Sequence, residues 1–243
     1  MTTQSPPALP ELAAAGSLPR ALDLASPSTI RRVRLMLEVT LLFVLMPFAM
    51  AFAVHTYRVP LLLLLQPVLI AFVLYLLWDP TFSLRRELTR GFSWRTLAAI
   101  LTLVPLVGAA MVAGVWMTYP GDLLSFPTYS PRLWLMVMIF YPLLSALPQE
   151  FVYRTFFFHR YSPLFRDRRW LAITVNGALF GFAHVIFGSL VSVVLSAALG
   201  LLLAWRYDRT RSVWAVWLEH SLYGQLAFTI GLGRYFFTGV SLN

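Results

Sequence analysis

The stretch SALPQEFVYRTFFFHR, residues Ser145 to Arg160, decides how this chain is interpreted. It lies in an apolar run long enough to span a membrane, yet it carries Glu150 and Arg154. Burying either charge in hydrocarbon is costly unless the charge is paired. Because residues four apart are neighbours on one helix face, the spacing predicts an intramembrane ion pair. In such a pair the two charges either only neutralise each other or form part of a polar functional site.

The composition around this stretch is that of a membrane protein. Of 243 residues, 59% are hydrophobic and only 12% are charged, whereas soluble domains carry about 25% charged residues. Seven apolar stretches are each long enough to cross about 30 Å of hydrocarbon as a helix. They lie near residues 35–54, 59–78, 95–117, 132–158, 170–187, 189–206 and 212–232. We therefore expect an all-α, polytopic bundle of about seven transmembrane helices around an intramembrane polar cavity. An eighth, shorter or re-entrant segment after GLGR is the alternative.

The chain divides into a short tail and one large domain. Residues 1–30 are rich in Pro, Ala and Ser, which predicts a disordered tail. Residues 31–243 form a single transmembrane domain, and Pro142 and Pro148 predict a kink in its fourth helix. Without cysteine, disulfides and thiolate sites are excluded.

The net charge of +9 comes from arginine alone, because the chain has no lysine. In a soluble protein this balance would suggest nucleic acid, but here the arginines lie between apolar runs. Most of them fall on the inner loops if the N-terminus is inside, which predicts an N-in, C-out chain. We expect an integral protein of a bacterial inner membrane with a cytoplasmic N-terminus. Its partners would be membrane lipid and a membrane-associated protein or peptide substrate, with no nucleic acid.

Two further stretches place histidines within predicted spans. NGALFGFAHV sets Asn176, Phe180 and His184 at four-residue steps, one stripe that resembles the wall of a wet cavity. WAVWLEHSLYG carries Glu219 and His220. Adjacent helical residues point about 100° apart, so only one of the two can face a cavity directly.

Glu150, His184 and His220 together suit the activation of water. A carboxylate or imidazole would take the proton, and the remaining groups would stabilise the oxyanion. The same three residues could instead hold zinc with an open fourth position, although their spacing differs from the helical H-E-x-x-H pattern. We expect no cofactor, and a divalent metal such as zinc at these three residues is the alternative.

These motifs resemble the CPBP intramembrane proteases, which include type II CAAX prenyl endopeptidases and lysostaphin-resistance protein A-like proteins. The family motifs E-E-x-x-x-R, F-x-x-x-H and H-x-x-x-N correspond here to QEFVYR, FGFAH and HSLYG, and the likeness covers residues 131–224. The resemblance implies a helical bundle whose cavity opens toward the cytoplasm. It also implies hydrolysis of a peptide bond in a membrane-associated, CAAX-like substrate. The first- and second-motif side chains would activate water, and the third-motif histidine would serve the oxyanion.

Two positions depart from those motifs. Gln149 stands in place of the first glutamate, and Gly224 stands in place of the asparagine. An amide cannot accept a proton from water, so the base function would move to Glu150, pass to a histidine or be lost. Tyr223 or a neighbouring polar residue would have to replace the missing side-chain donor.

Three hypotheses follow from these residues. In the first, the protein is an intramembrane endopeptidase in which Glu150 and His184 activate water, His220 stabilises the oxyanion and Arg154 orients the carboxylate. In the second, it is a catalytically impaired family member that acts as a membrane scaffold or immunity-type protein. The third is a proton-coupled transporter, which lacks support because the sequence shows no internal repeat.

Overall fold

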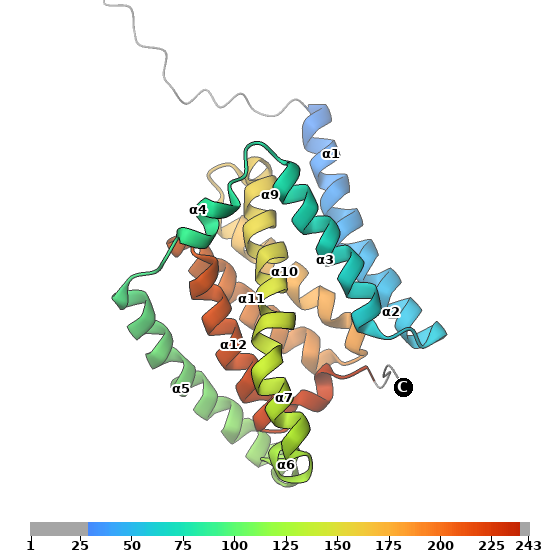
Figure 1. Cartoon of the computed structure of the whole chain (residues 1–243), viewed down its shortest axis with the longest axis vertical. Helices are drawn as coiled ribbons and strands as arrows, with labels where there is room; N and C mark the ends of the chain where they lie inside the picture. The colour runs from blue at the N-terminus through green and yellow to red at the C-terminus, as the bar shows by residue number, and fades with distance from the viewer. Residues whose placement is uncertain (1–28, 239–243) are drawn as a thin grey trace, which may run out of the picture.

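The structure, a computed structural model, describes residues 29–238 apart from the side chain of Leu62. Within that range every regular element is a helix or a helical turn (Figure 1). The predicted disordered tail lies outside the described residues, except for its last two positions, which begin the first helix.

The chain folds into twelve α-helices among the described residues, several of them joined end to end. The first half contains α1 (Thr29–Thr40), a π-helical turn (Leu41–Leu45), α2 (Met46–Tyr57), α3 (Leu61–Trp78), α4 (Leu84–Thr89), α5 (Trp94–Thr118), a 3₁₀ turn (Pro120–Asp122) and α6 (Ser125–Tyr129). The second half contains α7 (Pro131–Tyr141), a π-helical turn (Pro142–Ala146), α8 (Leu147–Glu150), a π-helical turn (Phe151–Phe156), α9 (Phe157–Phe165), α10 (Arg169–Ala183), a 3₁₀ turn (His184–Phe187), α11 (Leu190–Thr210), α12 (Val213–Thr229) and a 3₁₀ turn (Leu232–Phe236).

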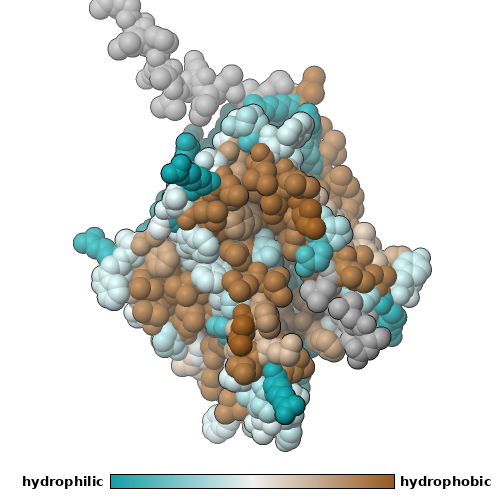
Figure 2. Space-filling view, viewed as in Figure 1, coloured by the Kyte–Doolittle hydropathy of each residue, from teal (hydrophilic) through white to brown (hydrophobic). Residues whose placement is uncertain are grey.

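Five continuous helical segments are long and apolar enough to cross a membrane, and they are Thr29–Tyr57, Trp94–Thr118, Pro131–Phe165, Arg169–Phe187 and Leu190–Thr210. The other two predicted stretches form α3 and the 17-residue α12. Figure 2 shows apolar side chains over most of the middle of one face, with the most hydrophilic ones mainly at its margins. The polytopic helical bundle is therefore confirmed. Where an eighth segment was the alternative, the described residues form only the turn Leu232–Phe236.

The segment from α7 to α9 runs through the bundle, with α1 to α3 on one side and α5 on the other (Figure 1). The helices α10 and α11 form the most closely packed pair, because glycines lie at their contact. A Cβ atom on Gly181 would lie 2.5 Å from the Cβ of Ala197, and one on Gly177 would lie 2.7 Å from the backbone nitrogen of Leu201. Small residues allow this close approach of helices in a membrane, where apolar burial gives no drive for association.

An aromatic cluster fixes the upper half of this central segment against the first helices. Phe43, in the π-helical turn between α1 and α2, is almost fully buried. Its ring packs edge to face on Tyr153, Phe157 and Tyr161, at centroid separations of 5.2, 5.5 and 6.0 Å. This geometry adds to the stabilisation from burial alone.

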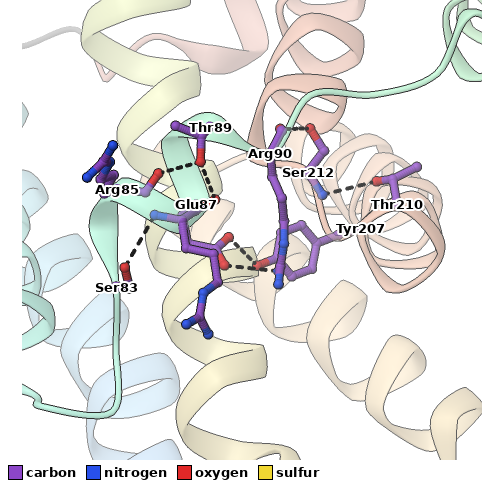
Figure 3. A network of polar contacts seen from close by, with 9 residues as sticks. Ser83, Arg85, Glu87, Thr89, Arg90, Tyr207, Thr210 and Ser212 are labelled. Atoms are coloured by element: carbon purple, nitrogen blue, oxygen red, sulfur yellow. Dashed lines mark hydrogen bonds and ion pairs between the residues drawn. The ribbon is translucent and has the colours of Figure 1, made fainter.

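The short helix α4 ties the start of α5 to the turn between α11 and α12 (Figure 3). The Tyr207 hydroxyl donates to Glu87 at 3.2 Å, and Arg90 forms an ion pair with the same carboxylate. The Ser212 hydroxyl donates to the Arg90 carbonyl oxygen at 2.9 Å. Helix α5 is otherwise packed mainly against α12.

We predict that Gly181→Ala lowers the free energy of unfolding by about 1–3 kcal/mol, because its methyl group meets the backbone of Ala197. The control is Gly114→Ala in α5, where an added methyl group meets open space. That change should leave stability unaltered or raise it by up to about 1 kcal/mol through helix propensity. Thermal unfolding of both variants in one detergent measures the difference, and equal shifts would contradict the proposed packing.

Candidate active site

The helix carrying QEFVYR is not regular, and this determines where its side chains point. π-helical turns Pro142–Ala146 and Phe151–Phe156 flank the four-residue α8. Such turns are rare in proteins overall, and many of those that occur are found at functional sites. The first begins at Pro142, one of the two prolines from which an irregularity was predicted. Of the two adjacent residues in α8, Gln149 lines a cavity and Glu150 is fully buried.

Two largely apolar cavities meet beside this helix. The smaller, about 360 Å³, lies between α5, α7 and the helices α10 to α12. The larger, about 540 Å³, lies between α2, α3 and α7. Both are lined by Tyr141, Ser145, Gln149 and His184, so these polar groups stand where the cavities join. A polar region inside an apolar bundle is the arrangement that the sequence predicts.

Glu150 lies behind this region rather than on its wall. Its Oε1 is 2.7 Å from Nδ1 of His220, and its Oε2 is 3.2 Å from Nε of Arg154 at an angle that does not form a hydrogen bond. Its side chain is 0% exposed and lines neither cavity. An ionised carboxylate only accepts, so Nδ1 of His220 carries a proton, and Nε2 is left to accept from a ligand when the ring is neutral or to donate when it is protonated.

Arg154 is held by further buried groups. Its Nη1 donates a short hydrogen bond to Oδ1 of Asn176, and Nδ2 of Asn176 donates to the Tyr153 carbonyl oxygen at 2.6 Å. The guanidinium carbon lies 4.9 Å from the centre of the Phe180 ring. Asn176 is fully buried in these contacts, so it does not form part of a wet cavity wall as its stripe predicts. Phe180 and His184, farther along the stripe, do line the smaller cavity.

His184 begins the 3₁₀ turn that ends α10. Its Nδ1 is 2.8 Å from the Phe180 carbonyl oxygen, which can only accept, so Nε2 carries the lone pair. The Phe180 ring contacts both imidazoles, with centroids 4.9 Å from His184 and 5.6 Å from His220. His55 of α2 is bound to the Ile186 carbonyl oxygen at 3.0 Å and secures the turn. Each catalytic-type imidazole thus has one fixed nitrogen and one available nitrogen.

Glu219 points away from its neighbour His220. Arg206 of α11 donates to both of its oxygens, at 2.8 and 2.9 Å, and this pair is buried. His220 lines the smaller cavity and Glu219 does not. The prediction that only one of these two residues faces the cavity is confirmed.

A metal does not fit these side chains as they stand. Among residues 29–238, no three His, Asp or Glu side chains lie together in a way that could hold a metal ion. Glu150 is already engaged by His220 and Arg154, while Nδ1 of His184 is held by the Phe180 carbonyl oxygen. The alternative zinc ligand set Glu150, His184 and His220 is therefore not assembled.

Tyr141 and Ser145 belong to the site, although the sequence motifs do not include them. With Gln149 they stand at four-residue steps, one helix face, and this spacing is the signal that could have found them. Nε2 of Gln149 donates to the Ser145 hydroxyl at 2.9 Å. From α12, Tyr223 and Gly224 also line the smaller cavity.

The residues that build the site lie mostly between α7 and α12. This region has a known counterpart. Residues 131–225 match the type II CAAX prenyl endopeptidase Rce1-like family. The match confirms the resemblance drawn from the three motifs and supports, at family level, a CAAX-type intramembrane protease in an integral membrane protein. Comparisons with curated proteins and with solved structures found no match to the chain.

Within this Rce1-like region, we predict that Arg154→Gln lowers the free energy of unfolding by about 3–5 kcal/mol, because it leaves a buried carboxylate without its counter-charge. Arg34→Gln is the matched control, since Arg34 also pairs with a glutamate four residues away but is 75% exposed. The control should cost less than about 1 kcal/mol. Thermal unfolding in detergent compares them, and similar losses would show that burial of the ion pair is unimportant.

Proposed function

We propose that the protein is an intramembrane endopeptidase that hydrolyses a peptide bond in a membrane-associated protein or peptide, with prenylated, CAAX-like chains as the substrate class. The observation that carries the proposal is the pair of imidazoles on one cavity, each with Nδ1 held by an acceptor. We place the protein in a bacterial inner membrane with its N-terminus in the cytoplasm. The apolar cavity walls suit a substrate that arrives from lipid.

The geometry suggests how the hydrolysis proceeds. Nε2 of His184 accepts a proton from water while the water oxygen attacks the carbonyl carbon of the substrate. Protonated His220 donates Nε2–H to the oxygen that becomes negative. The C–N bond then breaks, and the proton held by His184 passes to the leaving nitrogen.

Glu150 takes part through His220 and without touching water. A carboxylate bound to Nδ1 fixes the orientation of an imidazole and stabilises its protonated form. Arg154 and Asn176 hold that carboxylate in place, so they are positioning residues. This assignment keeps Glu150, His184 and His220 in one unit while moving the base function to an imidazole.

The second candidate is a catalytically impaired family member that acts as a membrane scaffold or immunity-type protein. One observation favours it: the cavity that His184 lines presents the amide of Gln149, whereas the Glu150 carboxylate is fully buried and does not line it. An amide cannot serve as a base, so all proton transfer would fall to the imidazoles.

We predict that His184→Ala and His220→Ala each reduce cleavage by about 10²–10⁴-fold, the usual contribution of a proton-transfer group. The measurement is hydrolysis of a farnesylated CAAX peptide by the full chain in proteoliposomes. His159→Ala is the control, because His159, near the start of α9, pairs with Asp79 at the end of α3 and lines neither cavity. Undiminished cleavage by both histidine variants would refute the assignment.

Gln149→Glu separates the two candidates. If the protein is an active protease, the parent cleaves the farnesylated peptide without help from this change. If catalysis has been lost, the parent is silent and Gln149→Glu gains activity by restoring a cavity-facing carboxylate. Gln225→Glu is the control, since Gln225 binds the Met138 carbonyl oxygen away from both cavities and should produce no gain.

A further inference from the structure

Tyr141 occupies the point where the two cavities and the imidazoles meet. It is the last residue of α7 and lines both cavities. Its ring lies edge to face with that of His220, at 6.0 Å between centroids, and 5.3 Å from that of Phe228. The hydroxyl has no hydrogen-bond partner among residues 29–238. The O–H of Tyr141 is thus a hydrogen-bond donor in a largely apolar cavity, and no group in the described part of the chain accepts from it.

Gly224 makes this position possible. It lies four residues after His220, on the same face of α12. A Cβ atom at Gly224 would overlap the hydroxyl oxygen of Tyr141 and the adjoining edge of its ring. Any other residue would therefore push the tyrosine out of the space beside His220. Because Gly224 of α12 has no side chain, the space beside it is filled by the Tyr141 side chain of α7.

We propose that the Tyr141 hydroxyl donates a hydrogen bond to the carbonyl oxygen of the peptide bond being cleaved, and that Gly224 provides the space for it. The inference rests on the proposed endopeptidase function. An ordinary tyrosine has a pKa of about 10 and is a donor at neutral pH. Such a donor, aimed at an oxygen that gains charge in the transition state, contributes about 10²–10³ in rate.

The other hydroxyls on the cavity are less suited to this role. The Tyr223 hydroxyl is enclosed and has no partner within the described residues, so a ligand cannot reach it without a rearrangement. The Ser145 hydroxyl also lines both cavities, but it accepts from Gln149, and of these residues only Tyr141 packs its ring on His220. Tyr141 therefore offers the donor that lies beside the His220 imidazole.

The first test is Tyr141→Phe, which removes the oxygen and keeps the ring that packs on His220 and Phe228. We expect kcat for the farnesylated peptide to fall by about 10²–10³ with KM nearly unchanged, since the contact strengthens only in the transition state. Tyr161→Phe is the matched control, because its partnerless hydroxyl lies in the aromatic cluster near Phe43. A larger loss from Tyr223→Phe than from Tyr141→Phe would overturn the proposal.

Binding supplies a readout that does not depend on turnover. A phosphinic peptide, which replaces the cleaved amide with a tetrahedral anion, should bind Tyr141→Phe about 10²-fold more weakly than the parent, whereas the matching amide peptide should not distinguish them. Gly224→Ala should reproduce the loss by displacing the tyrosine. Equal phosphinic-peptide affinity in parent and Tyr141→Phe refutes the tyrosine contact, whether or not the parent cleaves. Tyrosine-dependent binding by a parent that cleaves nothing would instead refute the protease function.

Discussion

A carboxylate buried in the middle of a membrane protein must be compensated, and the compensation of Glu150 organises the centre of this fold. Its two oxygens take up an imidazole from α12 and a guanidinium four residues along its own helix. The guanidinium in turn requires Asn176 of α10. Because an unpaired buried charge is so costly, these contacts fix three helices relative to one another. Conformations in which α12 slides or rotates lose the pairing.

The same compensation decides which groups remain for chemistry. Once Glu150 is enclosed, the groups on the cavity are imidazoles, hydroxyls and one amide. The Phe180 ring links the charged interior to the cavity, because it packs against Arg154 and also contacts the imidazoles of His184 and His220. Behind the cavity, Glu150 holds the His220 ring through Nδ1, and Asn176 holds Arg154, so the cavity-facing groups are oriented by buried contacts, as a preorganised site requires.

Much of this architecture could be predicted from the sequence, because hydrocarbon leaves few alternatives to helices. The apolar runs locate the helices, and intramembrane charges at i, i+4 identify the residues that meet. Spacing could not tell whether Gln149 or Glu150 faces the cavity, since two π-helical turns change the rotation of that helix. The four-residue spacing likewise predicted that Asn176 and His184 share one cavity wall. The stripe on α10 in fact runs from the buried interior at Asn176 to the cavity at His184. Tyr141 and Ser145 share this four-residue spacing with Gln149. An uncharged hydroxyl residue in a membrane span is not unusual, so the sequence alone does not single them out.

The two cavities differ in what bounds them. The larger is bordered by the aromatic cluster, including Phe43, Phe72 and Tyr153, which interlock across several helices. The smaller takes one wall from α5, a lipid-facing helix with one main packing partner and a short tether at its start. A shift of α5 would change the smaller cavity at little cost in buried contacts, whereas a change at the aromatic border of the larger cavity would separate interlocked rings. Bulk that varies from ligand to ligand is thus best tolerated beside α5, and shape discrimination is best exerted at the aromatic cluster.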